Sequence, residues 1–173
     1  MRRRPGRLAT DQRGTSLAEI LVACVIIAIG LVGLLSAIPT ASYGLQEGRQ
    51  LSTATFLVNQ RLEQVRNAAW TATPANDCLG TSASSTVAPT SAACNGAAVT
   101  TFPDEAPIAS PYTDYTRTIR VIDCSIGVGC GGVVNATFRQ VTVVVSYQPA
   151  TGTGVAAAGT TKSAIVSMLV AQR

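Results

Sequence analysis

The sequence predicts an α+β protein in which one long N-terminal helix, membrane-spanning in its first half and amphipathic in its second, packs on a small antiparallel sheet. Three observations predict this architecture. An apolar run without a charged residue extends from Ile20 to Leu35. A stripe of apolar residues at helical spacing follows over residues 51–69. Three segments rich in β-branched and aromatic residues come last, separated by glycine-rich stretches.

The positive charge of the chain is confined to its first fourteen residues. Arginines there outweigh the single Asp11, so the whole net charge of +4 lies before Thr15 and the remainder is neutral. Arginines beside an apolar helix favour a cytoplasmic position for that end of the helix. Nucleic-acid binding is not expected, because it would need a basic patch on the folded domain. The arginines are Arg2, Arg3, Arg4, Arg7 and Arg13.

The apolar run is long enough to cross a membrane. A helix from Leu17 to Ile38 would extend roughly 33 Å, which spans the hydrocarbon core of a bilayer. The run is longer than the apolar part of a secretory signal peptide, and residues 36–42 offer only a weak signal-peptidase site. Glu19 lies at its leading edge, where a carboxylate near lipid is costly. Position alone leaves two interpretations open: Glu19 lies in the headgroup layer, or it has a specific charged partner.

The residues around Glu19 resemble the N-terminal signature of type IV prepilins and type II secretion pseudopilins. The matching segment reads Arg13-Gly14-Thr15-Ser16-Leu17-Ala18-Glu19-Ile20-Leu21-Val22-Ala23. The resemblance implies that a prepilin peptidase cuts after Gly14, that Thr15 becomes the first mature residue and is N-methylated, and that Glu19 is the fifth. Thr15 departs from the phenylalanine usual at this position. The head carries no comparable motif.

The resemblance also implies how the subunit assembles. The Glu19 carboxylate of one subunit would pair with the Thr15 ammonium of its neighbour in a filament, so that neither charge is left unpaired in an apolar core. The segment from Ile29 to Leu34 resembles PilV-like minor pilins and the minor pseudopilin I of type II secretion. Gly30 and Gly33 would let neighbouring helices approach closely. The implied partners are the prepilin peptidase, the major pilin, other minor pilins, the inner-membrane assembly platform and the inner membrane itself.

Beyond the apolar run, the sequence predicts a break and then a second helical segment. Pro39 is expected to kink or interrupt the helix, and Gly44 and Gly48 are expected to weaken it further. The stripe that follows is expected to pack on a sheet, and Phe56 falls on its polar side. The stripe consists of Leu51, Thr55, Val58, Leu62, Val65 and Ala69. The expected organisation is a cleaved leader over residues 1–14, a transmembrane or filament-core helix over 15–38, an amphipathic helix over 39–70 and a β-rich head over 71–173.

The head begins with a long loop. Residues 71–111 are rich in Thr, Ser, Ala and Pro and lack periodicity, with a possible short strand over 98–102. Four cysteines in a translocated domain predict two disulfides, and three connectivities are open. The local pairs, Cys78 with Cys94 and Cys124 with Cys130, are favoured because each closes a short loop. Cys24 is expected to be a small apolar filler within the run.

Three strands are expected after the loop, over residues 113–123, 137–147 and 163–170. The glycine-rich segments 127–132 and 152–159 would connect them as an antiparallel meander. No enzyme activity, metal or cofactor is expected. The chain has no histidine and no convincing nucleophile–base pair, and its acidic residues form no dense calcium loop.

These features predict a structural role, as a minor pilin that joins or primes a type IV pilus. A type II secretion minor pseudopilin is the alternative within the same family. A tip-displayed adhesin or DNA-binding pilin is the alternative of another class. The expected location is the inner membrane, with a single pass and a periplasmic C-terminal head, and then the filament at the cell surface.

Overall fold

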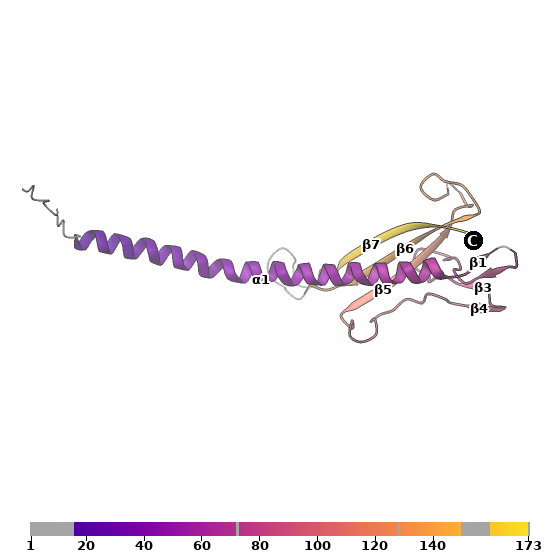
Figure 1. Ribbon diagram of the computed structural model, residues 1–173, viewed down its shortest axis with the longest axis horizontal. Helices are drawn as coiled ribbons and strands as arrows, with labels where there is room; N and C mark the ends of the chain where they lie inside the picture. The colour runs from indigo at the N-terminus through magenta and orange to yellow at the C-terminus, as the bar shows by residue number, and fades with distance from the viewer. Residues whose placement is uncertain (1–15, 72, 128, 150–159, 173) are drawn as a thin grey trace, which may run out of the picture. The chain divides into compact units, whose positions relative to one another are not determined.

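The computed structural model describes residues 16–71, 73–127, 129–149 and 160–172 (Figure 1). Helix α1 (Leu17–Asn67) comes first and short and long β-strands follow it, so the fold is α+β. The chain divides into two units, Met1–Ser42 and Tyr43–Arg173. The first contains the apolar part of α1, and the second contains the rest of α1 and all the strands.

The start of α1 is set by Ser16. Its carbonyl oxygen accepts hydrogen bonds from the N–H groups of Glu19 (2.9 Å) and Ile20 (3.2 Å). Ser16 and Glu19 also have the spacing of a capping box, and an acidic residue in the first turn is stabilised by the partial positive charge of the helix N-terminus.

The predicted break at Pro39 and Gly44 is wrong, because α1 continues through both residues. Proline removes a single N–H donor, and the helical hydrogen bonds on either side of it can still form. The hydroxyl of Ser42 donates to the carbonyl of Pro39 (2.8 Å). This bond does not replace the one that proline removes, since the missing N–H of Pro39 would have donated to the carbonyl of Leu35.

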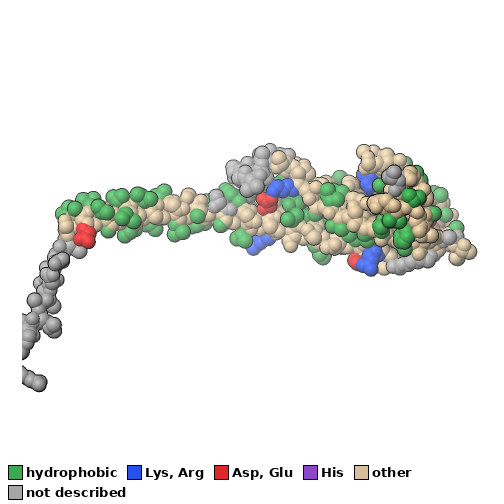
Figure 2. Space-filling model, turned by 90° about the horizontal axis from the view of Figure 1, so that it is seen from above, with side chains coloured by type: hydrophobic (Ala, Val, Ile, Leu, Met, Phe, Trp, Pro, Cys, Tyr) green, Lys and Arg blue, Asp and Glu red, His purple; other side chains and the backbone are tan. Residues whose placement is uncertain are grey.

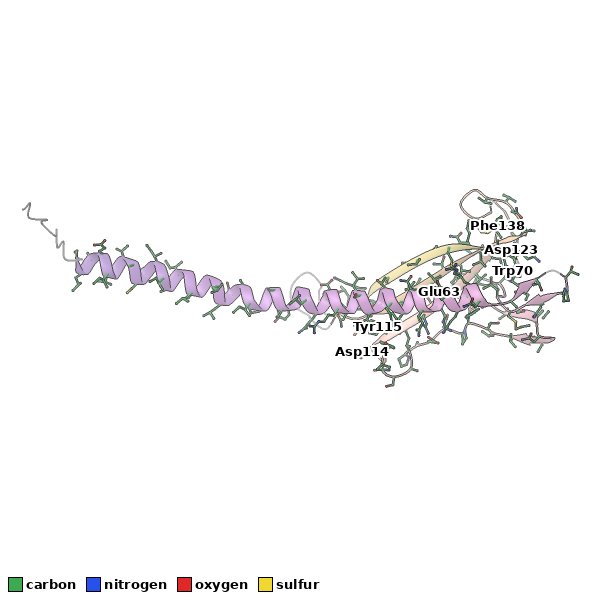
Figure 3. The ribbon with its side chains drawn as sticks, in the orientation of Figure 1. Glu63, Trp70, Asp114, Tyr115, Asp123 and Phe138 are labelled. Atoms are coloured by element: carbon green, nitrogen blue, oxygen red, sulfur yellow. A yellow bond between two sulfur atoms is a disulfide. The ribbon has the colours of Figure 1, made fainter. Side chains whose placement is uncertain are left out.

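The main sheet of the second unit is an antiparallel meander in the order β5–β6–β7, formed by β5 (Tyr115–Asp123), β6 (Phe138–Tyr147) and β7 (Lys162–Ala171). Tyr115 lies opposite Tyr147, and Phe138 lies opposite Ala171. The three expected strands are confirmed, with ends that differ by one or two residues. Tyr115 and Asp114 mark the start of β5 in Figure 3.

The segment expected to be a loop contains two small hairpins. Strand β1 (Trp70–Thr71) pairs with β2 (Asn76–Asp77), and β3 (Ser91–Cys94) pairs with β4 (Ala97–Val99). The β3–β4 turn is Asn95-Gly96, and both residues have positive φ, 49° and 81°. Asn-Gly favours this hairpin turn because both residues tolerate such a backbone. The Asn95-Gly96 pair is therefore a sequence signal for the β3–β4 hairpin.

The core lies between α1 and the inner face of the main sheet. Val58, Leu62 and Val65 of the predicted stripe are buried. Leu51, Thr55 and Ala69 are exposed, and the prediction was wrong for them. Ala54, Leu57 and Arg61 are buried in addition, so the packed face lies further round the helix than expected. The sheet contributes Tyr115, Ile119, Val121, Val141, Val143, Val145 and Tyr147.

Candidate membrane-spanning and assembly helix

The side chains of residues 17–38 are not covered by any described part of the chain. Every leucine, isoleucine and valine between Leu17 and Ile38 is between 53% and 77% exposed. Figure 2 shows these hydrophobic side chains in green along the helix. The segment is long and apolar enough to cross a membrane. Apolar surface of this extent needs an environment other than water.

Glu19 is the only charged residue between Ser16 and Gln46. A charged residue costs roughly 2.5–3.5 kcal/mol at the bilayer centre and less near its edge. Each leucine, isoleucine, valine or phenylalanine favours insertion by roughly 0.3–0.6 kcal/mol. With about a dozen such residues on the segment, the apolar contribution outweighs the cost of Glu19. Membrane insertion therefore remains favourable with the carboxylate in place.

The Glu19 carboxylate is exposed, and the described residues form no hydrogen bond or ion pair with it. Gly14 and Thr15 lie outside the described residues. The cleavage after Gly14, the N-methylation of Thr15 and the pairing of Thr15 with Glu19 therefore stay predictions.

The two glycines of the apolar segment have open surroundings. A Cβ atom at Gly30 or Gly33 would meet nothing within 4 Å. Glycine at these positions is therefore not required by packing among the described residues. Cys24 is exposed and unpaired, so its small apolar side chain also faces the environment of the helix.

Both disulfides lie in the second unit. Cys78 is bonded to Cys94, with Cα atoms 4.5 Å apart, and Cys124 to Cys130, with Cα atoms 5.0 Å apart. These are the two local pairs that the sequence favoured. The first joins the segment after β2 to β3, and the second closes the loop that follows β5.

Three acidic residues of the head, Asp77, Asp104 and Glu105, lie in ion pairs that the sequence did not predict. Glu105 binds two arginines, Arg61 of α1 and Arg117 of β5. Both arginine side chains are about nine-tenths buried, at 10% and 7% exposure. The Nε of Arg117 donates to Glu105 at 2.8 Å. The strand pattern contained one signal, because Arg117 falls at an inward-facing position of its strand and a buried charge needs a partner.

Two further ion pairs join the segment between α1 and β5 to the main sheet. Arg120 of β5 binds Asp104 at 2.7 Å. Arg139 of β6 binds Asp77 at 2.8 Å, and its guanidinium lies 4.4 Å from the ring centre of Trp70. Trp70 follows the C-terminal end of α1 (Figure 3).

The ion pairs change the acidity of both carboxyl groups. The hydrogen bond from Arg120 holds the pKa of Asp104 below its usual value of 3.8. Burial raises the pKa of Asp77, but hydrogen bonds from Arg139 and from the N–H groups of Gly80 and Leu79, with the charge of Arg139, outweigh it and leave that pKa lowered. Both groups are therefore charged in the neutral pH range.

Among the described residues, no group of three or more His, Cys, Asp or Glu side chains comes together in a way that could hold a metal ion. Comparison of the chain with models of protein families, with curated proteins and with solved structures finds no match in any of the three. A functional assignment therefore rests on the residues and geometry of this chain.

Proposed function

We propose that this protein is a minor pilin of a type IV pilus, which joins the filament or primes its assembly after its leader is removed. The observation that carries the proposal is a lone carboxylate, Glu19, in the first turn of α1, at the start of its exposed apolar segment. It follows the candidate cleavage glycine Gly14 at the spacing of the prepilin signature. The basic leader, the disulfide-bonded head and the apolar segment support the same assignment.

Cleavage after Gly14 would free an ammonium group at Thr15. In the membrane, that ammonium and the Glu19 carboxylate can both reach the headgroup layer. In a filament, each would be surrounded by apolar helices, where an unpaired charge costs several kcal/mol. Pairing Glu19 of one subunit with Thr15 of the next removes this cost and fixes the axial register between them.

The apolar side chains support transfer from membrane to filament. Lipid tails and neighbouring apolar helices are similar environments for leucine, isoleucine and valine. Moving residues 17–38 between them therefore costs little hydrophobic free energy. Gly30 and Gly33 would then allow close helix contacts, since nothing in the described chain occupies the space beside them.

A type II secretion minor pseudopilin would use the same Gly14, Thr15 and Glu19 in the same way. Co-purification decides between the two: a pilus subunit is recovered with a major pilin, and a pseudopilin with the secretion pseudopilus. A tip adhesin or DNA-binding pilin is less well supported, because the chain after the leader is neutral and offers little non-specific attraction to phosphate.

The proposal is tested with Glu19→Gln and Glu19→Ala in cells that assemble filaments. Glutamine can replace glutamate in a capping box, but it cannot neutralise an ammonium. If the carboxylate pairs with Thr15, both variants still insert in the membrane but are depleted from sheared filaments by tenfold or more. Glu63→Ala is the matched control, because Glu63 is an exposed glutamate further along the same helix. Normal incorporation of Glu19→Ala would disprove the pairing, and rescue by glutamine would assign Glu19 to capping alone.

A further inference from the structure

The two edge strands of the main sheet differ in how the described chain covers them. The β5 edge is covered by loop backbone. Glu105 and Arg117 exchange two backbone hydrogen bonds (2.9 and 2.8 Å), and the N–H of Ser82 donates to the carbonyl of Val121 (2.8 Å). The opposite edge is β7, and no described strand pairs with its outer side. Among the residues that the structure describes, only the β5 edge is therefore covered.

The outward backbone groups of β7 follow from its pairing with β6. The N–H of Gln172 donates to the carbonyl of Thr137 (2.8 Å). Because bonded and non-bonded positions alternate along an antiparallel pair, even-numbered residues of β7 bond β6 and odd-numbered residues point their N–H and C=O groups away. The outward residues are Ser163, Ile165, Ser167, Leu169 and Ala171. A row of such groups is recognised by an extended polypeptide strand.

This edge lacks the features that usually keep a free strand from pairing. Residues 163–171 contain no charged residue and no proline, and their pairing with β6 shows no register shift. Lys162, at the start of β7, is held in an ion pair with Glu47 of α1. Charges, prolines and bulges are the common protections of natural edge strands. The β7 edge is therefore open to another strand.

Apolar surface lies on both faces of the open edge. On the outer face, Ile165 is 60% exposed and Leu169 is 50% exposed. On the core side, Ala164, Val166, Met168 and Val170 are only partly buried. A groove there is lined by residues of β7 and by Arg66 of α1. An added strand would cover apolar side chains on both faces at once.

The sequence of β7 is close to symmetric about Ser167. Ile165 and Leu169 stand two positions to either side, and the small residues Ser163 and Ala171 stand four positions away. On the core side, Val166 is matched by Met168, and Ala164 by Val170. An antiparallel partner centred on Ser167 would place each residue opposite one of the same kind. Shifting the register by two residues would place Ile165 opposite Ser167 in one direction and opposite Ala171 in the other.

We infer that β7 pairs with β7 of a second copy of this chain, antiparallel and centred on Ser167, to form a continuous sheet across a two-fold axis. Residue 167 of one copy exchanges two backbone hydrogen bonds with residue 167 of the other. Ile165 packs against Leu169 of the second copy, and the reverse contact repeats it. The absence of charge along the strand means that no like charges meet at the axis.

The pairing is independent of the proposed function. Strand β7 runs beside α1, since Lys162 contacts Glu47 at one end and the groove at the other includes Arg66. The two-fold axis therefore makes residues 43–67 of the two copies run in opposite directions. Subunits of one filament all point in the same direction. The β7–β7 dimer would therefore form between subunits that are not in the same filament.

Cysteine cross-linking of the full chain in detergent tests the pairing. In a Cys24→Ser background, Ser167→Cys places two thiols at the axis. Ser163→Cys is the matched control, because this exposed serine is on the same face but its two copies would lie about 27 Å apart. We expect at least tenfold more disulfide-linked dimer from Ser167→Cys.

Co-expressed Ser163→Cys and Ala171→Cys chains should cross-link to each other, since these positions face one another. Equal yields at 163 and 167, or a disulfide to a different protein, would overturn the inference.

Sedimentation provides a second measurement. Ser167→Lys brings two ammonium groups together at the axis, whereas Ser163→Lys keeps its charges apart and opposite Ala171. We expect Ser167→Lys to reduce the dimer fraction at least tenfold and Ser163→Lys to leave it nearly unchanged, with both heads folded by Trp70 fluorescence. A monomeric unmodified chain, or a dimer that Ser167→Lys leaves intact, would contradict pairing through β7. Loss of the dimer would leave filament incorporation, and so the proposed function, untouched.

Discussion

The two units of this chain contain the same types of apolar residue, but these are exposed in the first unit, whereas many are buried in the second. Leu31 in the first unit is 54% exposed, whereas Leu57, on the same helix in the second, is 1% exposed. In the head, the main sheet supplies the apolar partners. Along residues 17–38, the described chain supplies none, although the segment is long and apolar enough to cross a membrane. The same helix thus contributes to the folded core at one end, and under the proposed function it contributes to membrane insertion and assembly at the other.

The largest expected effect on the stability of the head comes from replacing a buried leucine, in contrast to an exposed one. Leu57→Ala should destabilise the head by about 4 kcal/mol, because it leaves a cavity in a fully buried site. Leu31→Ala should leave the stability of the head unchanged. Trp70 is the only tryptophan and is buried in the head. Its fluorescence during denaturant unfolding of the full chain in detergent measures both variants, and equal effects would refute the separation.

Removal of Glu105 should have the next largest effect. Glu105→Ala leaves Arg61 and Arg117 buried without their carboxylate, and we expect a loss of about 3 kcal/mol. The value is at the lower end for buried ion pairs because the Glu105 side chain is 28% exposed. The control is Glu63→Ala, which breaks an exposed pair with Arg66 and should cost about 0.5 kcal/mol or less. A loss for Glu105→Ala no greater than for Glu63→Ala would show that the buried network does not stabilise the head.

The disulfide at the end of β5 should contribute less. Cys124 and Cys130 close a loop with a sequence separation of 6. Closing a loop this short restricts the unfolded chain by about 2 kcal/mol. Replacing both cysteines with serine should lower stability by that amount, as measured by the same fluorescence assay. No change would mean that the loop is already ordered in the unfolded chain or that the bond does not form in cells.

Acid should weaken the head through Asp77 and Asp104. Their pKa values are lower in the folded protein than the usual 3.8, so their stabilisation is full above that value and is lost as the pH falls through the lower folded values. The melting temperature should therefore decrease below about pH 4. In Asp104→Asn this decrease should be smaller. If the melting temperatures of the unmodified protein and of Asp104→Asn decreased equally with falling pH, Asp104 would make no contribution.

Much of the fold could be predicted from the sequence, because it depends on local residue patterns. β-Branched runs located β5, β6 and β7, and short loop lengths favoured the two disulfides. The Arg61–Glu105–Arg117 network was not readable, since its members are far apart in sequence and only the tertiary fold brings them together. The packed face of α1 also includes Ala54, Leu57 and Arg61, which lie beside the expected stripe. The continuity of α1 through Pro39 does not follow from the sequence, because proline removes one helical hydrogen bond and local patterns do not show whether the rest of the helix outweighs that loss.

Under the proposed function, the apolar helix becomes an assembly element when its basic leader is removed. The mass of the N-terminal peptide of the protein isolated from its native cells tests this claim most directly. The account predicts a chain that begins at Thr15, with or without one methyl group on its amine. A chain that still begins at Met1, or one that begins beyond residue 36, would contradict it.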